Sequence, residues 1–207
     1  MKYYFKLGVI LLLITAVASG VLAVVNNYTK PLIAQNKQKT EEEARRMVLP
    51  KAETFETDSI EIQEAKVKPD PLMIQKESDK SSYFKYYIGK DEAGEVTGYT
   101  FVARKYGYSS NIETMVGVKP DLKINKIKVI NQAETPGLGA NCENEDFTKN
   151  FIGRTIPKLL VDKDGGDIES LTGATITSRA IINSIKDGLQ NLKQALSSSD
   201  NNEEDKE

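Results

Sequence analysis

Residues 169–178 read ESLTGATITS, and the segment after them has apolar side chains at nearly every third or fourth position. Such spacing puts the apolar side chains on one face of an α-helix. It predicts an amphipathic helix from Ser178 to about Leu196, with Thr177 or Ser178 as its N-cap. The apolar positions are Ile181, Ile182, Ile185, Leu189, Leu192 and Leu196. A long helix that must cover an apolar surface is therefore expected to end the folded part of the chain.

The start of this predicted helix combines two features of an anion-binding site. The first backbone N–H groups of a helix have no partner within it and carry a partial positive charge. Gly173 and Ala174 are small enough to let another group approach the backbone closely. This chemistry is typical of a phosphate site, but a hydroxyl cap after a glycine turn is also ordinary helix chemistry. From these residues alone, both interpretations stand.

The N-terminal part of the chain contains a long apolar run. Residues 7–25 are 19 consecutive residues without a charge, and as a helix they span about 28 Å, close to the thickness of a bilayer's hydrocarbon core. A cleavable signal peptide is the alternative, since residues 16–18 resemble a cleavage site. The apolar run continues past that site through residues 21–25, and the aromatic residues 3–5 suit a membrane interface. We therefore expect a retained transmembrane anchor.

Lys2 and Lys6 precede the apolar run. Because positive residues stay preferentially in the cytoplasm, we expect a cytoplasmic N-terminus, a single span of the cell membrane and an extracytoplasmic domain. The expected organisation is a transmembrane anchor over residues 1–28, a helical stalk over 29–50, a folded domain over 51–196 and a disordered acidic tail over 197–207.

Composition removes several classes of function. The formal net charge of −2 gives no electrostatic platform for nucleic acid. The absence of histidine excludes histidine bases, Ser-His triads and histidine-ligated metals. Cys142 is the only cysteine, so the chain forms no internal disulfide and holds no cysteine-ligated cluster by itself. We expect Cys142 to be a small, partly buried residue, with a redox role as the alternative.

The middle of the chain has the alternating pattern of β-strands. A hairpin turn is expected at residues 91–94, a short strand at 59–62 and a short helix at 145–152. The acidic run 162–167 lacks the spacing of an EF-hand, so a surface turn is expected there rather than a calcium site. The fold class is therefore α+β, with a mostly antiparallel sheet and flanking helices after a single transmembrane helix. The main strands are expected at residues 83–88, 99–103, 112–118 and 127–129.

A second motif, ETPGLG at residues 134–139, lies between the last expected strand and the short helix. Two glycines around Leu138 make a tight loop that can pass close to a planar ligand. A generic Pro-Gly turn is the simpler interpretation of these six residues when they are taken alone.

Residues 172–177, TGATIT, resemble the flavinylation motif Asp-x-x-Ser/Thr-Gly-Ala-Thr-x-Thr, in which FMN is joined through its phosphate to the last threonine. The ETPGLG loop resembles the loop upstream of that motif in the G subunit of the Rnf electron transport complex. Residues 106–118 also resemble a turn and strand of that family, and the motifs occur in the family's order. Two positions depart from the family pattern, because Glu169 stands in place of Asp and Gln132 in place of a frequent histidine.

The resemblance implies a membrane-anchored flavoprotein that carries FMN covalently through a phosphodiester to Thr177. It implies an electron relay, not catalytic alone, in a complex that passes electrons between ferredoxin and NAD and couples this transfer to sodium or proton translocation. The implied partners are the other Rnf subunits, a flavin transferase and the lipid bilayer, with no metal and no nucleic acid. The implied FMN contacts besides Thr177 are Thr172, Gly173, Ala174, Thr175, Ser178, Glu134, Thr135, Gly137, Leu138, Gly139 and Tyr108.

Three alternatives stay open at this point. The C subunit of the sodium-translocating NADH:quinone oxidoreductase shares the flavin motif but is usually longer. A cofactor-free, membrane-anchored binding module would use the threonine-rich turn only as a helix cap. An independent flavin reductase would need a site for NADH, and the sequence shows no glycine fingerprint for that nucleotide.

Overall fold

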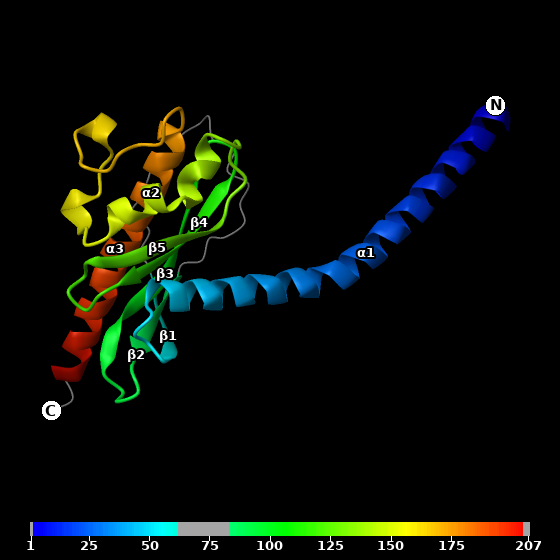
Figure 1. Ribbon diagram of the computed structural model, residues 1–207. Helices are drawn as coiled ribbons and strands as arrows, with labels where there is room; N and C mark the ends of the chain where they lie inside the picture. The colour runs from blue at the N-terminus through cyan, green and yellow to red at the C-terminus, as the bar shows by residue number, and fades with distance from the viewer. Residues whose placement is uncertain (1, 62–82, 205–207) are drawn as a thin grey trace. The chain divides into compact units, whose positions relative to one another are not determined.

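The structure is a computed structural model that describes residues 2–61 and 83–204. The chain forms two compact units, Met1–Glu42 and Glu43–Glu207. The first unit consists of most of helix α1 (Lys2–Val48), and the second holds a five-stranded sheet, helix α3 and several short helices (Figure 1).

Helix α1 is continuous from Lys2 to Val48, with Pro31 inside it. Of the described helices, α1 alone is long and apolar enough to cross a membrane, and its apolar part is not buried within the protein. A residue before proline disfavours the helical conformation, and α1 ends just before Leu49 and Pro50. The expected anchor and stalk are thus one uninterrupted helix, and the boundary at residue 28 stays a prediction.

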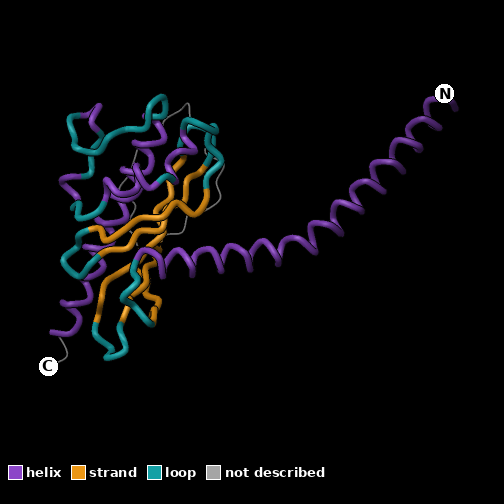
Figure 2. Tube along the Cα trace, in the orientation of Figure 1, coloured by secondary structure: helices purple, strands orange, loops and turns teal. Residues whose placement is uncertain are grey.

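The five strands form one antiparallel sheet in the order β1-β2-β3-β4-β5. Figure 2 shows the strands in orange. The four main strands expected from the sequence are confirmed, and so is the hairpin turn at 91–94. The expected short strand at 59–62 is corrected by β1, which begins at Thr54 and pairs with β2, whereas Ile62 lies outside the described residues. The strands are β1 (Thr54–Glu61), β2 (Tyr83–Lys90), β3 (Val96–Tyr106), β4 (Asn111–Val118) and β5 (Ile124–Asn131).

Helix α3 (Thr175–Glu204) lies along one face of the sheet (Figure 1). Ile185 and Leu189 of α3 are buried in the same apolar cluster as Phe101 of β3, as their helical spacing predicted. Gly188 lets the helix approach the strand closely, because a Cβ at that position would lie 2.2 Å from the ring of Phe101. The main core of the protein is therefore the layer between α3 and the sheet.

Both ends of α3 differ from the expectation. The helix begins at Thr175, so Thr177 and Ser178 lie within its first turn and neither is the N-cap. At the other end α3 continues to Glu204, so residues 197–204 are helical where we expected a disordered tail.

The C-terminal end of α1 packs on the face of the sheet that points away from α3. Val48 is fully buried against Met115 of β4, in an apolar cluster separate from the main core. The backbone carbonyl of Val48 accepts a hydrogen bond from Asn125 Nδ2 at 2.7 Å. The folded unit therefore begins at Glu43, earlier than the expected start at residue 51.

Short helical turns connect β5 to α3. The expected helix at 145–152 is present in two pieces, and the acidic run 162–167 is a surface turn in which Asp164 pairs with Arg179 at 2.6 Å. Cys142 is fully buried rather than partly buried, and burial raises its pKa to about 12. No group of three potential metal ligands occurs within the described part of the chain. The short helices are η1 (Gly139–Glu143), α2 (Glu145–Thr148), η2 (Lys149–Phe151), η3 (Ile156–Lys158) and η4 (Asp162–Asp164).

Candidate functional site

Both sequence motifs line one pocket of about 540 Å³ beside the start of α3. Its walls come from the loop before β4, the 134–139 loop after β5, and the turn that leads into α3. A pocket of this size lies within the range of cofactor sites. Every lining residue except Ile176 belongs to the set expected from the sequence. The lining residues are Tyr108, Glu134, Thr135, Leu138, Gly139, Gly173, Ala174, Thr175, Ile176 and Thr177.

Three residues of the expected set do not line the pocket. Gly137 has a φ of 76° in the loop, and a Cβ there would meet no other atom within 4 Å. Thr172 is exposed on the turn before α3. The Ser178 hydroxyl donates to the carbonyl of Ala174 at 3.1 Å and accepts a hydrogen bond from the Leu171 N–H at 2.9 Å. Ser178 therefore stabilises the turn before α3 and does not line the pocket.

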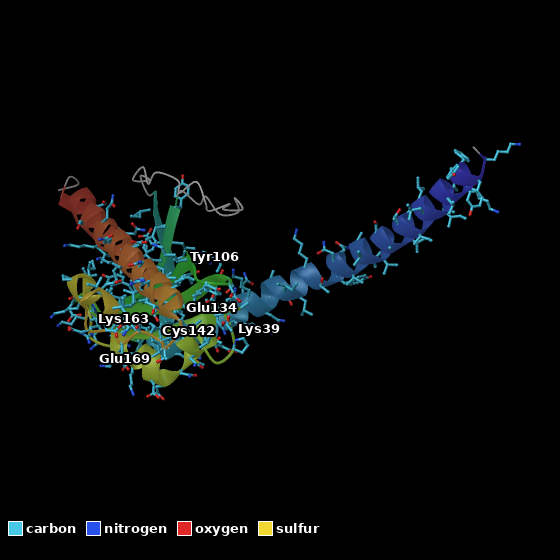
Figure 3. All side chains as sticks on the ribbon, turned by 90° about the horizontal axis from the view of Figure 1, so that it is seen from above. Lys39, Tyr106, Glu134, Cys142, Lys163 and Glu169 are labelled. Carbon is cyan, nitrogen blue, oxygen red and sulfur yellow. The ribbon has the colours of Figure 1, made fainter. Side chains whose placement is uncertain are left out.

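The side chains of Thr177 and Glu134 form the buried end of the pocket. The Thr177 hydroxyl donates a hydrogen bond to Glu134 Oε2 at 2.6 Å. Thr177 is 0% exposed and Glu134 is 5% exposed. Figure 3 labels Glu134 in the folded unit. Gly139 makes room for this contact, since a Cβ there would lie 2.8 Å from Thr177 Oγ1. The hydrogen bond joins the 134–139 loop to the first turn of α3.

The Glu134 carboxylate also accepts hydrogen bonds from three successive backbone N–H groups. Tyr108 N donates to Oε2 at 3.2 Å, and Ser109 N and Ser110 N donate to Oε1 at 2.9 and 3.1 Å. Gly107 permits this approach, because a Cβ there would lie 2.8 Å from Oε1. Successive backbone N–H groups that point at one spot stabilise an anion, so this loop holds Glu134 in its ionised form.

These hydrogen bonds decide the charge of Glu134. Burial by itself would raise the pKa of the carboxyl group, but the hydrogen bonds from Thr177 and from the three backbone N–H groups outweigh burial. The pKa of Glu134 is consequently held below its ordinary value. A negative charge is therefore a fixed part of the site at neutral pH.

We expect Glu134 to make a pH-dependent contribution to the free energy of unfolding. Its pKa in the folded state lies below the unfolded value of about 4.3. The contribution is therefore complete above that value and is lost as the pH falls through the folded pKa. In urea titrations followed by circular dichroism, the stability difference between wild type and Glu134→Gln should narrow from pH 7 to about pH 3. A difference that stays constant over this range would contradict a native-state carboxylate.

The rim of the pocket is apolar, in contrast to its buried end. Leu138 is 42%, Ile176 53% and Tyr108 67% exposed. Gly173, at a φ of 72°, turns the chain into α3 so tightly that a Cβ there would lie 3.0 Å from Leu138 Cδ2. The first N–H groups of α3 have no partner within the helix. The apolar rim suits a flat aromatic ring, and the N–H groups at the start of α3 suit a phosphate, which together are the chemistry of FMN.

Ile176 is the pocket residue that the sequence did not indicate. It stands between Thr175 and Thr177, and a single apolar residue between two polar ones produces no helical or strand periodicity. Only the structure shows that Ile176 is exposed on the first turn of α3, where it can line the pocket.

Two family profiles match separate parts of the chain. The RnfG N-terminal region matches residues 2–46, which form nearly all of α1. The FMN-binding domain matches residues 107–190, and this range contains every residue that lines the pocket.

Proteins of known identity align over most of the chain. The G subunit of the Na⁺-translocating ferredoxin:NAD⁺ oxidoreductase complex of Acetobacterium woodii is 34% identical, over 91% of each chain. The G subunit of the ion-translocating oxidoreductase complex of Escherichia coli K12 is 31% identical, over 87% of each chain. The crystal structure of Shewanella oneidensis NqrC has a similar fold, with a TM-score of 0.57 at 18% identity over 78% of this chain and 99% of that one. The chain therefore belongs to the family of G subunits of ion-translocating oxidoreductase complexes.

Proposed function

We propose that this chain is a membrane-anchored flavoprotein subunit that relays electrons through FMN in an Rnf-type ferredoxin:NAD oxidoreductase complex coupled to sodium or proton translocation. The observation that carries this proposal is that residues of both sequence motifs line the same pocket, inside the region that matches the FMN-binding domain. Bound FMN supplies the redox chemistry, and the protein binds it, orients it and limits its contact with water.

We further propose that the FMN phosphate is joined to Thr177 Oγ1 as a phosphodiester. Thr177 lies at the polar end of the pocket, whereas Thr172 is exposed and lies outside its walls. A phosphodiester keeps about one negative charge, and a helix N-terminus stabilises such a charge by only about 0.3–1 kcal/mol. The covalent bond, rather than the helix dipole, would therefore retain the cofactor. Leu138 and Tyr108 on the rim would contact the ring system.

Mass spectrometry tests this attachment. The full chain, produced together with a flavin transferase and purified in detergent, should be heavier than the unmodified chain by one FMN less one water. Trypsin cleaves after Lys163 and Arg179, so the added mass should lie on the peptide of residues 164–179. Fragmentation of that peptide should assign the mass to Thr177. The same chain produced without the transferase is the control, and an unmodified mass in both samples would instead support a cofactor-free binding module.

The C subunit of a sodium-translocating NADH:quinone oxidoreductase is the less favoured identity. The likeness to NqrC is at 18% sequence identity and concerns the fold alone. The G-subunit relatives align at 34% and 31% identity, and a profile specific to the N-terminal region of that subunit matches α1.

The proposal also includes the orientation of the chain in the membrane and its binding partners. Lys2 and Lys6 favour a cytoplasmic N-terminus, so α1 would span the cell membrane once and the pocket would lie outside the cytoplasm. The proposed partners are the lipid bilayer, the other membrane and peripheral subunits of the complex, which supply and receive the electrons, and the flavin transferase that attaches FMN. The isolated subunit is not expected to oxidise NADH.

A further inference from the structure

Thr177, the proposed attachment residue, is inaccessible in this structure. Its side chain is 0% exposed, and it lies behind Gly139 and against Glu134. In a reactive geometry, the phosphorus of a flavin donor must come within about 3–3.5 Å of Oγ1. The buried hydroxyl offers no such approach, although Thr172 nearby is exposed. The closed arrangement therefore covers the one hydroxyl that lies at the end of the pocket.

Glu134 takes part in each of the hydrogen bonds that hold this closed arrangement together. Its carboxylate accepts from the N–H groups of residues 108–110 and from the Thr177 hydroxyl, so it ties the loop before β4 to α3. Its backbone N–H donates to Gln132 Oε1 at 2.7 Å, and Gln132 Nε2 donates to Glu143 Oε1 at 2.8 Å. The Glu134–Thr177 hydrogen bond is therefore one of the contacts that cover the hydroxyl.

Esterification of Thr177 is incompatible with the observed contact. The oxygen of a phosphate ester carries no proton, so Thr177 Oγ1 could no longer donate to Glu134 Oε2, which lies 2.6 Å away. The phosphodiester would also bring about one negative charge next to a carboxylate that is itself held ionised. Like charges repel strongly in a buried site. The hydrogen-bonded pair is consequently a property of the unmodified protein.

We propose that Glu134 is a positioning residue that keeps unmodified Thr177 closed, and that FMN is attached only in conformers in which the Glu134–Thr177 hydrogen bond has opened. This inference rests on the proposed attachment at Thr177. In the opened conformer, Thr177 Oγ1 attacks the flavin-side phosphorus of flavin adenine dinucleotide. The Oγ1–P bond forms, the P–O bond of the pyrophosphate breaks, and adenosine monophosphate leaves. The hydroxyl proton passes to the transferase or to water, and nothing is oxidised or reduced.

The rate of attachment tests this proposal, because weakening the Glu134 contact should accelerate the reaction. The full-length unmodified protein in detergent is mixed with a flavin transferase and flavin adenine dinucleotide, and covalent flavin is followed by fluorescence in denaturing gels. Glu134→Gln keeps the size of the side chain and replaces charge-assisted hydrogen bonds by weaker neutral ones. When opening is faster than transfer, the rate follows the population of the open conformer. We expect an increase of about tenfold.

Two further variants accompany this measurement. Glu145→Gln removes an exposed carboxylate from the first turn of α2 and should leave the rate unchanged. Ser110→Ala removes the hydroxyl that accepts the Ala133 N–H at 2.8 Å and donates to Glu134 Oε1 at 3.4 Å, so it loosens the same loop without replacing Glu134 itself. Attachment to this variant should be about threefold faster than to wild type.

Amide hydrogen exchange gives an independent readout. In Glu134→Gln the N–H groups of Ser109 and Ser110 should exchange faster, because they donate to the carboxylate in the wild type. A rate of attachment equal to or below that of wild type, together with faster exchange, would overturn the inference that Glu134 holds Thr177 closed. If wild type and variants all fail to gain flavin at Thr177, the proposed attachment itself is wrong, and the two failures are therefore distinguishable.

Discussion

The Thr177→Ala protein should carry no covalent flavin after production together with a flavin transferase. The substitution removes the oxygen that would form the ester, and no other hydroxyl lies at the buried end of the pocket among the described residues. The fold should persist, because Glu134 keeps its three backbone N–H partners. In-gel flavin fluorescence per amount of protein should fall to the background of a sample made without the transferase.

Two matched variants separate the attachment site from the rest of the pocket. Thr175→Ala removes a hydroxyl that lines the same pocket and should leave the covalent fluorescence at the wild-type level. Thr177→Ser keeps a hydroxyl at the attachment position and should retain covalent flavin. Fluorescence in Thr177→Ala equal to that of wild type would refute the assignment of Thr177.

Gly188→Ala should lower the free energy of unfolding of the domain by about 1–3 kcal/mol, the usual cost of overpacking a core. The added Cβ would lie 2.2 Å from the ring of Phe101, which is itself fully buried and whose centroid lies 5.5 Å from that of Phe84. In an unobstructed helix the same change would be stabilising by about 1 kcal/mol, because alanine has the higher helix propensity. The sign of the effect therefore reports the close approach of α3 to β3.

Urea titrations in detergent, followed by circular dichroism, measure this change. Gln190→Ala is the matched control, because Gln190 lies two residues further along α3 and is exposed. Its free energy of unfolding should stay within about 0.5 kcal/mol of wild type. A Gly188→Ala protein as stable as wild type, or more stable, would show that Phe101 can move aside.

The parts of the fold that follow from the sequence are those in which a regular spacing reports burial. Ile185 and Leu189 revealed α3 because they recur on its buried face. The start of α3 was misplaced because Ser178 bonds backward to the turn instead of capping the helix. The start of β1 was missed because Thr54–Glu61 is largely polar and depends on pairing with β2, which follows after a long stretch of sequence.

The candidate site, like the fold, could be predicted from the sequence only in part. Its two motifs could be recognised as local sequences, but no local pattern indicates that Glu134 and Thr177, which are 43 positions apart, share a hydrogen bond. That contact depends on Gly107 and Gly139, whose missing side chains leave room for the carboxylate. The structure therefore changes the interpretation of Glu134 from an expected neighbour of the ring system to the hydrogen-bond partner of Thr177.

The order of the strands along the chain also bears on when each part of the domain becomes available during synthesis. Each strand after β1 pairs with the strand synthesised just before it, because the order β1-β2-β3-β4-β5 follows the chain. Pairing of this kind lets the sheet assemble as the polypeptide is made. Helix α3, which carries Thr177, is synthesised last. The sheet therefore lacks the helix that completes its main core, and Glu134 lacks its Thr177 partner, until the last part of the chain has been made.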